Sequence, residues 1–209
     1  MPFIAFLGLA ATGKTTIANH LANHFHGASF NEPAREDWPL FVTEGFETSA
    51  FEVMQWFRCF QVEAIQKAKR SGEGIFAFTD AYYQKILSYY LHAPSSGWII
   101  DPADPYFKNF SDLCSKDRSQ LPNADYIIFL KADYSNWRQL VSSRQGPGDN
   151  IVLEKAFATQ EEMEQATKSL CAEESIPLLI LNQEFGKLEN TINKIIEWLE
   201  REEMNRETH

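Results

Sequence analysis

The stretch "GLAATGKTT" at Gly8–Thr16 decides the fold, because it joins an apolar run to an amphipathic helix through a glycine-rich turn. It matches the pattern G-x4-G-K-[ST], in which glycines let backbone N–H groups wrap a phosphate. The apolar run "FIAFLGL" before it has the length of a strand buried in a parallel sheet. After it, Ile17, Leu21 and Phe25 recur with the spacing of one helix face. The stretch therefore predicts a strand, a phosphate-binding loop and a helix.

The loop supplies both backbone and side-chain groups for a nucleotide. The helix that follows directs its positive N-terminal end at the same place as the loop N–H groups. We expect Lys14 to reach the β and γ phosphates and the Thr15 hydroxyl to bind Mg²⁺. The candidate phosphate-binding residues are Gly8, Ala10, Ala11, Thr12, Gly13, Lys14, Thr15 and Thr16.

Strand-like and helical segments alternate along the rest of the chain. A short "ASF" and the apolar runs "GIFAFTD", "ADYIIFLKA" and "IPLLILN" are typical of strands, and amphipathic segments lie between them. This alternation indicates right-handed βαβ units. We predict an α/β, three-layer P-loop fold with a five-stranded parallel sheet flanked by helices. The 209 residues contain no repeat or linker, which favours a single domain over 1–209.

Composition limits the classes of partner. The formal net charge of −10 disfavours a nucleic acid polymer, although a cleft with local positive charge can still bind a small anion. The apolar runs are shorter than the roughly 18 residues that span a bilayer, and the N-terminus lacks a signal-peptide pattern. Three widely spaced cysteines suit a reducing compartment. We therefore expect a cytoplasmic protein that does not associate with a membrane.

Two polar residues indicate what receives the phosphate. Glu32 in "NEPAREDW" follows the short second strand, and strand ends of such a sheet meet at the ligand crevice. A carboxylate there can accept the proton of an attacking hydroxyl, or Glu32 can belong to an ordinary surface turn. Gln61 interrupts the apolar stripe of the helix predicted over 51–69. Its amide suits a nucleobase edge, although a backbone partner or a rotated helix would also explain it.

The stretch "SSRQGPGDN" predicts a lid at about 142–158. Its glycines and proline break a helix, and Thr159 and Glu162 have capping-box spacing for the next one. Lids of this kind exclude water and present a cation to a transferring phosphoryl group. Arg144 is the candidate cation, and the alternative is a solvated surface arginine.

These motifs together resemble the deoxynucleoside kinase family, in the wider group that includes thymidylate kinases. The resemblance is carried, in chain order, by "GLAATGKTT", "EPAREDW", "FQVEAIQKAK" and "LPNADYIIFLKAD". In "EPAREDW" one more residue than usual separates Glu-Pro from Trp. The resemblance implies a nucleoside acceptor, ATP and Mg²⁺ as cofactors, and often a homodimer.

The resemblance also implies roles for single residues. Glu32 would be the catalytic base, acting with Lys14 and with Arg144 as the lid arginine. The expected substrate-binding residues are Glu32, Trp38, Phe57, Arg58 and Gln61.

One motif departs from the family. The third strand ends "Thr79-Asp80-Ala81-Tyr82", where the family has Asp or Glu followed by Arg. Asp80 can still hold Mg²⁺ through water, so Thr15 and Asp80 are the expected metal ligands. Ala81 removes a cation at the phosphoryl-transfer centre, and Arg58 and Arg138 are candidates to replace it.

Three hypotheses follow. The leading one is an enzyme that transfers the γ-phosphoryl group of ATP to the 5′-hydroxyl of a deoxynucleoside. The second is a thymidylate-type nucleoside monophosphate kinase, or a kinase of another small alcohol. The third is a nucleotide-binding kinase homologue with weak catalysis, which the loss of the arginine at Ala81 would explain.

Overall fold

A five-stranded sheet forms the centre of the computed structural model, which describes residues 2–48, 50–71, 76–91, 100–143 and 150–207. The strand order is β2-β3-β1-β4-β5, and every neighbouring pair is parallel. The strands are β1 Phe3–Gly8, β2 Ala28–Ser29, β3 Ala77–Thr79, β4 Tyr126–Lys131 and β5 Leu178–Asn182. The α/β class and the five parallel strands predicted from the sequence are confirmed.

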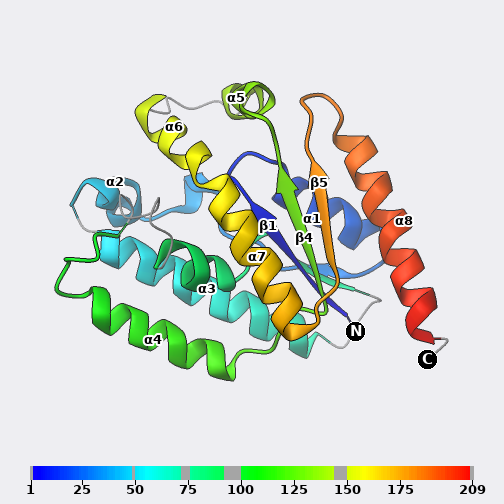
Figure 1. Cartoon of the computed structure of the whole chain (residues 1–209), viewed down its shortest axis with the longest axis horizontal. Helices are drawn as coiled ribbons and strands as arrows, with labels where there is room; N and C mark the ends of the chain where they lie inside the picture. Colours follow the sequence, from blue (N-terminus) through cyan, green and yellow to red (C-terminus); the bar gives the residue numbers. More distant parts are fainter. Residues whose placement is uncertain (1, 49, 72–75, 92–99, 144–149, 208–209) are drawn as a thin grey trace.

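Helices cover both faces of the sheet, which gives the expected three layers (Figure 1). One face packs against α1 Lys14–His24 and α8 Leu188–Glu207. The other packs against α3 Ala50–Arg70, α4 Phe107–Gln120 and α7 Gln160–Glu174. The remaining helical segments are η1 Arg35–Asp37, α2 Leu40–Thr48, η2 Lys85–Tyr90, α5 Tyr134–Ser143 and α6 Asn150–Ala158.

Strand β1 explains why the first apolar run is continuous. Its side chains alternate between two cores, and all six of its residues are buried. Ile4 and Phe6 face the core under α1 and α8. Phe3, Ala5 and Leu7 face the core on the opposite side. Because each large apolar side chain contributes about 1.5–3 kcal/mol when fully buried, the run fixes β1 at the sheet centre.

Three local features differ from the sequence prediction. The helix expected over "AYYQKILSYYL" is a shorter π-helical segment, η2, which follows a turn in which the Thr79 hydroxyl bonds the Ala81 backbone. Helix α4 was not predicted, because only Phe110 and Cys114 of its residues are buried. Helix α7 begins after Thr159 as predicted, but the Thr159 side chain makes no capping bond. Its hydroxyl donates to the Ala156 carbonyl instead, and its backbone is helical.

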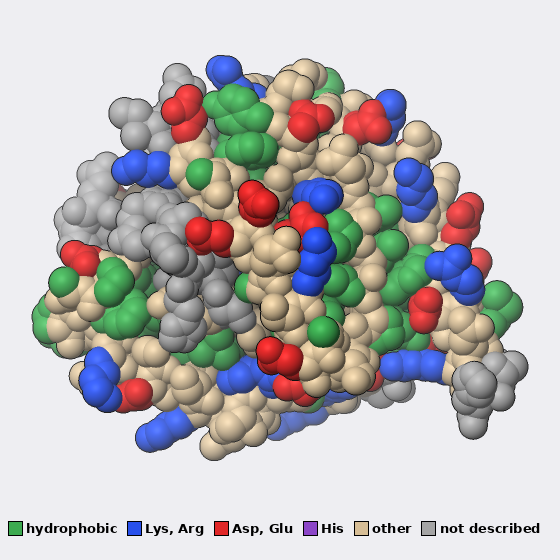
Figure 2. Space-filling model, viewed as in Figure 1, with side chains coloured by type: hydrophobic (Ala, Val, Ile, Leu, Met, Phe, Trp, Pro, Cys, Tyr) green, Lys and Arg blue, Asp and Glu red, His purple; other side chains and the backbone are tan. Residues whose placement is uncertain are grey.

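All three cysteines are free thiols, of which Cys59 is exposed and Cys114 and Cys171 are buried. On the face shown in Figure 2, acidic and basic side chains are interspersed among apolar ones. Within the described ranges, no helix combines the length and apolarity that crossing a bilayer requires.

Candidate active site

The phosphate loop follows β1 and turns directly into α1. Gly8 has a φ of +128°, and a Cβ added there would lie 2.1 Å from the Leu130 carbonyl oxygen of β4. Gly13 precedes α1 with a φ of +87°. Ala11 also has a positive φ, 66°, which is unusual for a residue with a side chain. Glycine is thus required at position 8 because the loop backbone lies close to β4, and at position 13 because the backbone is left-handed where α1 begins.

The loop is held by side chains from inside and outside the motif. The Thr12 hydroxyl donates to the Leu9 carbonyl at 2.9 Å. The Lys14 ammonium group donates to the carbonyls of Gly8 and Leu9 at 3.2 and 2.6 Å, which keeps it against the loop backbone. From α5, the buried Trp137 indole donates to the Ala10 carbonyl at 2.9 Å. This bond links the loop to the helix that precedes residues 144–149.

Asp80 connects the phosphate loop to Glu32. It lies just past β3, which neighbours β1 in the sheet, and it is 5% exposed. One carboxylate oxygen accepts a hydrogen bond from the Thr15 hydroxyl, and the other accepts from the Glu32 backbone N–H at 2.8 Å. Residues far apart in the sequence are therefore brought together at the carboxyl ends of three adjacent strands, as expected for a site in a parallel α/β sheet.

Glu32 and Gln61 are in direct contact. The Gln61 amide nitrogen donates to a Glu32 carboxylate oxygen at 2.9 Å, and Gln61 is only 3% exposed. The amide oxygen of Gln61 is buried and has no hydrogen-bond partner among the residues that the structure describes. The sequence prediction that Gln61 is a buried polar residue on an apolar face is confirmed. Its donor is bound to Glu32, and its buried acceptor oxygen has unused hydrogen-bonding capacity.

The environment of Glu32 suits a proton acceptor. Burial of its carboxylate raises the pKa above the ordinary value of 4.5, and the nearby charge of Asp80 raises it further. Lys85, the Gln61 amide and Lys14 act in the opposite direction. A raised carboxylate pKa brings the group closer to neutral pH, where a general base works best.

Comparison with solved structures places this arrangement in a known fold. Thymidylate kinase from Candida albicans superposes with a TM-score of 0.67 at 19% identity, over 97% of this chain and 92% of that one. Deoxyadenosine kinase from M. mycoides with bound dATP gives 0.70 at 15% identity, over 96% and 100%. The same enzyme with dCMP and dCDP gives 0.70 at 16% identity, over 95% and 99%.

The chain shares the fold of these two kinases. No family model and no curated protein matches it by sequence. At these identities the likeness concerns the fold, so any kinase activity has to be argued from the residues of this chain.

Two aromatic residues predicted to line the substrate site lie next to each other in this kinase fold. The rings of Trp38 and Phe57 are 5.2 Å apart, edge to face. Trp56 adds a third ring 5.0 Å from Phe57. The Trp38 indole donates to the Pro33 carbonyl at 3.0 Å, which ties the ring to the residue after Glu32. The aromatic group is therefore anchored to the backbone of the segment that contains Glu32.

Two of the arginines predicted to act in the site contact other residues in the structure. The Arg58 guanidinium forms a bidentate pair with Asp117 of α4, at 2.5 and 2.8 Å, and the Tyr83 hydroxyl donates to the same carboxylate. Arg138 stacks over the Tyr134 ring at 5.8 Å. Arg144 lies outside the described residues. Arg58 and Arg138 thus have partners other than Glu32.

The oxygen atoms of Thr15 and Asp80 fit Mg²⁺, which prefers hard oxygen ligands. Their hydrogen bond places a hydroxyl and a buried carboxylate side by side at the end of the phosphate loop. Among the described residues, no group of three or more His, Cys, Asp or Glu side chains could hold a metal ion. A cation here would therefore share its coordination with nucleotide phosphates, as is usual for Mg²⁺.

Sequence reasoning missed Lys85 and Trp137. Lys85 begins η2 just after Asp80, and it is the opposite charge that acts most strongly on Glu32. A search for any basic residue soon after the third strand would have found it. Trp137 carried no comparable signal, because its partner is a backbone carbonyl in a distant loop.

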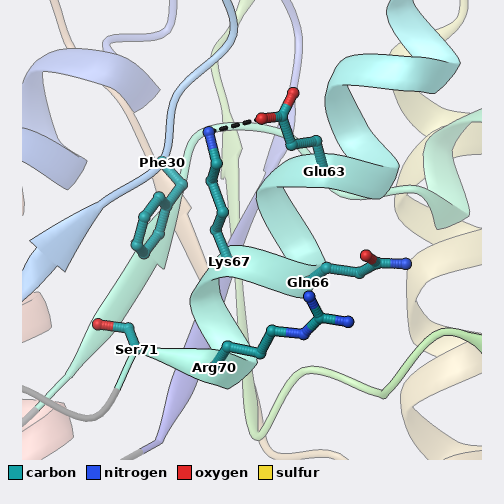
Figure 3. Close-up of a pocket in the computed structure, with 6 residues that line it drawn as sticks. All are labelled: Phe30, Glu63, Gln66, Lys67, Arg70 and Ser71. Carbon is teal, nitrogen blue, oxygen red and sulfur yellow. Dashed lines mark ion pairs between the residues drawn. The ribbon is translucent and has the colours of Figure 1, made fainter.

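A separate cavity of about 500 Å³ lies beside the C-terminal half of α3. It is lined by Phe30, Glu63, Gln66, Lys67, Arg70 and Ser71 (Figure 3). Lys67 lies between Phe30 and α3 and pairs with Glu63 at 2.6 Å. The cavity contains none of the residues of the phosphate loop, so it is distinct from the site built around Glu32.

Proposed function

We propose that this protein transfers the γ-phosphoryl group of ATP to the 5′-hydroxyl of a deoxynucleoside. The observation that carries the proposal is the junction at Asp80, which bonds both the Thr15 hydroxyl and the Glu32 backbone. It holds the backbone of Glu32 against the buried Asp80 carboxylate, which also contacts the phosphate-binding loop. The structural likeness to deoxyadenosine kinase, seen with dATP and with dCMP, supports a deoxynucleoside acceptor.

The residues divide the reaction between them. The loop N–H groups and Lys14 bind the phosphates, and Glu32 accepts the proton of the attacking hydroxyl. Mg²⁺ held by Thr15 and Asp80 would neutralise charge on the nucleotide phosphates. Trp38 and Phe57 offer an apolar wall for a nucleobase, and the unpaired oxygen of Gln61 can accept a hydrogen bond from it. Arg144 would close over the phosphates as part of the lid at about 142–158.

A radiolabelled-ATP screen over deoxynucleosides tests this proposal. Thymidine monophosphate and simple alcohols serve as further acceptors, so the screen separates a deoxynucleoside kinase from a monophosphate kinase. We expect transfer to at least one deoxynucleoside and a drop of about 10²–10⁴-fold for Glu32→Gln, the range for loss of a general base. Lys14→Ala should lose activity as well, because it removes the cation at the phosphates.

Glu36→Gln is the matched control. Glu36 lies in the same segment as Glu32 but is exposed, so its variant should keep the wild-type rate. Tight ATP binding by calorimetry without transfer to any acceptor would reject the proposal in favour of a kinase homologue that only binds nucleotide. A preference for thymidine monophosphate over thymidine would assign the second hypothesis.

A further inference from the structure

A buried tryptophan from outside the motif holds the phosphate loop. The indole N–H of Trp137, on α5, donates to the Ala10 carbonyl at 2.9 Å, and Trp137 is 1% exposed. Phe157 of α6 packs against the indole, with the two ring centroids 5.5 Å apart. Moving the indole away from the loop would break both this ring contact and the hydrogen bond. The indole N–H is therefore a fixed donor beside the loop.

The bond to Ala10 also sets the direction of the next backbone N–H. The peptide bond between Ala10 and Ala11 is trans, so its carbonyl and its N–H point in opposite directions. Because the carbonyl is turned to Trp137, the Ala11 N–H faces away from the indole. Ala11 also has a left-handed φ of 66°, which is unfavourable for a residue with a Cβ. Such a conformation persists when surrounding contacts hold it, and the Trp137 bond is a contact of this kind.

The backbone N–H groups in this part of the loop are available to an anion. Ala11 and Thr12 are buried, and within the described part of the chain the N–H groups of Ala11, Thr12 and Gly13 have no acceptor. Left-handed backbone at positions 11 and 13 lies on either side of Thr12. Successive N–H groups in a turn of this kind form a concavity that binds phosphate oxygens. The Ala10 peptide, which Trp137 holds, is at the edge of this concavity.

We infer that Trp137 is a positioning residue for nucleotide phosphates, because its indole holds the Ala10 peptide so that the Ala11 N–H is directed to the anion before the nucleotide binds. Trp137 acts through the loop backbone, and it belongs neither to the phosphate-loop motif nor to the acceptor side of the site. This inference rests on the proposed function only through the binding of ATP.

The inference predicts a specific loss of phosphate affinity. Without the indole bond, the Ala10 peptide adopts more than one orientation, and only a fraction of the molecules present the Ala11 N–H to the ligand. The apparent dissociation constant rises by the inverse of that fraction. We expect a rise of about 5- to 10-fold, which corresponds to the net contribution of one hydrogen bond.

Calorimetry of Trp137→Phe with ATP and with inorganic tripolyphosphate tests the inference. Phenylalanine keeps an aromatic ring beside Phe157 but has no N–H to donate. Tripolyphosphate carries phosphates without a base, so both dissociation constants should rise by the same factor. KM for the acceptor that the screen identifies should change by less than about twofold, because the acceptor does not bind through the phosphate loop.

Trp198→Phe is the matched control. Trp198 is a buried tryptophan of α8 whose ring contacts Tyr126 at 5.5 Å, and it packs on the opposite face of the sheet from Trp137. The control variant should bind both ligands as the wild type does, and thermal unfolding checks that both variants are folded in the assay. If Trp137→Phe does not fold, benzothienylalanine at position 137 replaces it, since that residue keeps the shape of the indole and lacks the N–H.

The outcomes distinguish this inference from the proposed function. Unchanged affinity of Trp137→Phe for both ligands, or an equal loss in Trp198→Phe, overturns the inference and leaves the proposed function standing. A loss for ATP alone also overturns it, because the effect would then concern the base and not the phosphates. A wild type that binds ATP without transferring its phosphoryl group overturns only the proposed function, and a wild type that binds neither ligand overturns both.

Discussion

Replacing Gln61 with methionine separates what this residue does for stability from what it does for Glu32. Methionine has nearly the same shape and length but neither donates nor accepts at this position. The variant loses a hydrogen bond of 2.9 Å to a carboxylate, which contributes about 1.5–3 kcal/mol. It also removes an amide oxygen that is buried without a partner, which costs the wild type about 1–3 kcal/mol.

The two contributions oppose each other in the free energy of unfolding. We therefore expect the free energy of unfolding of Gln61→Met to remain within about 2 kcal/mol of the wild type by urea unfolding. In catalysis nothing offsets the lost bond, because it orients Glu32 and favours its ionised form. A loss of 1.5–3 kcal/mol in the transition state lowers kcat/KM by about 10- to 100-fold.

The assay is urea unfolding together with acceptor phosphorylation, both measured on the same preparations. Gln66→Met is the matched control, because Gln66 is an exposed glutamine on the same helix. Gln61→Glu adds a contrast, since a second carboxylate beside Glu32 forces the pair to share a proton. Destabilisation of Gln61→Met by more than about 3 kcal/mol, or an unchanged kcat/KM, would refute the reasoning.

Three further predictions concern the fold. Gly8→Ala should abolish folding or lower the free energy of unfolding by more than about 3 kcal/mol, because its Cβ would lie 2.1 Å from a backbone oxygen. Gly186→Ala has nothing within 4 Å of its Cβ and should lower that free energy by only about 1 kcal/mol, because of its positive φ. Thermal unfolding compares the two variants. A thiol reagent at pH 8 should modify Cys59 alone until the protein is denatured, because burial raises the pKa of the other two cysteines to about 11; fast labelling of all three contradicts this. Burial raises the pKa of Glu164, but ion pairs with two lysines at 2.7 and 3.1 Å lower it more, so that the pKa lies below 4.5. The ionised Glu164 therefore stabilises the folded protein at neutral pH, and this contribution is lost as the pH falls through the lowered pKa. Glu164→Gln should therefore be less stable than wild type at pH 7 and equal to it near pH 3, and a constant difference in unfolding midpoint would contradict the assignment.

The sequence by itself determined the sheet and the phosphate loop. The first apolar run is continuous because β1 is buried on both faces, and the glycines of the loop stand where the backbone requires them. These features depend on neighbours in the chain, so they can be read from the order of residues. The burial of Gln61 could be predicted for the same reason, since it follows from helical spacing.

Only the tertiary structure decided how the site is assembled. Asp80 contacts both Thr15 and Glu32 because β3 lies next to β1 in the sheet, and strand order is a long-range property. The same applies to Arg58, which was predicted from its sequence position to bind substrate. In the structure it pairs with Asp117 of α4, a helix that could not be predicted because few of its residues are buried. Lys85, whose charge lowers the pKa of Glu32, lies in a π-helical segment that no periodicity predicts, because that segment depends on packing between elements and not on spacing along the chain.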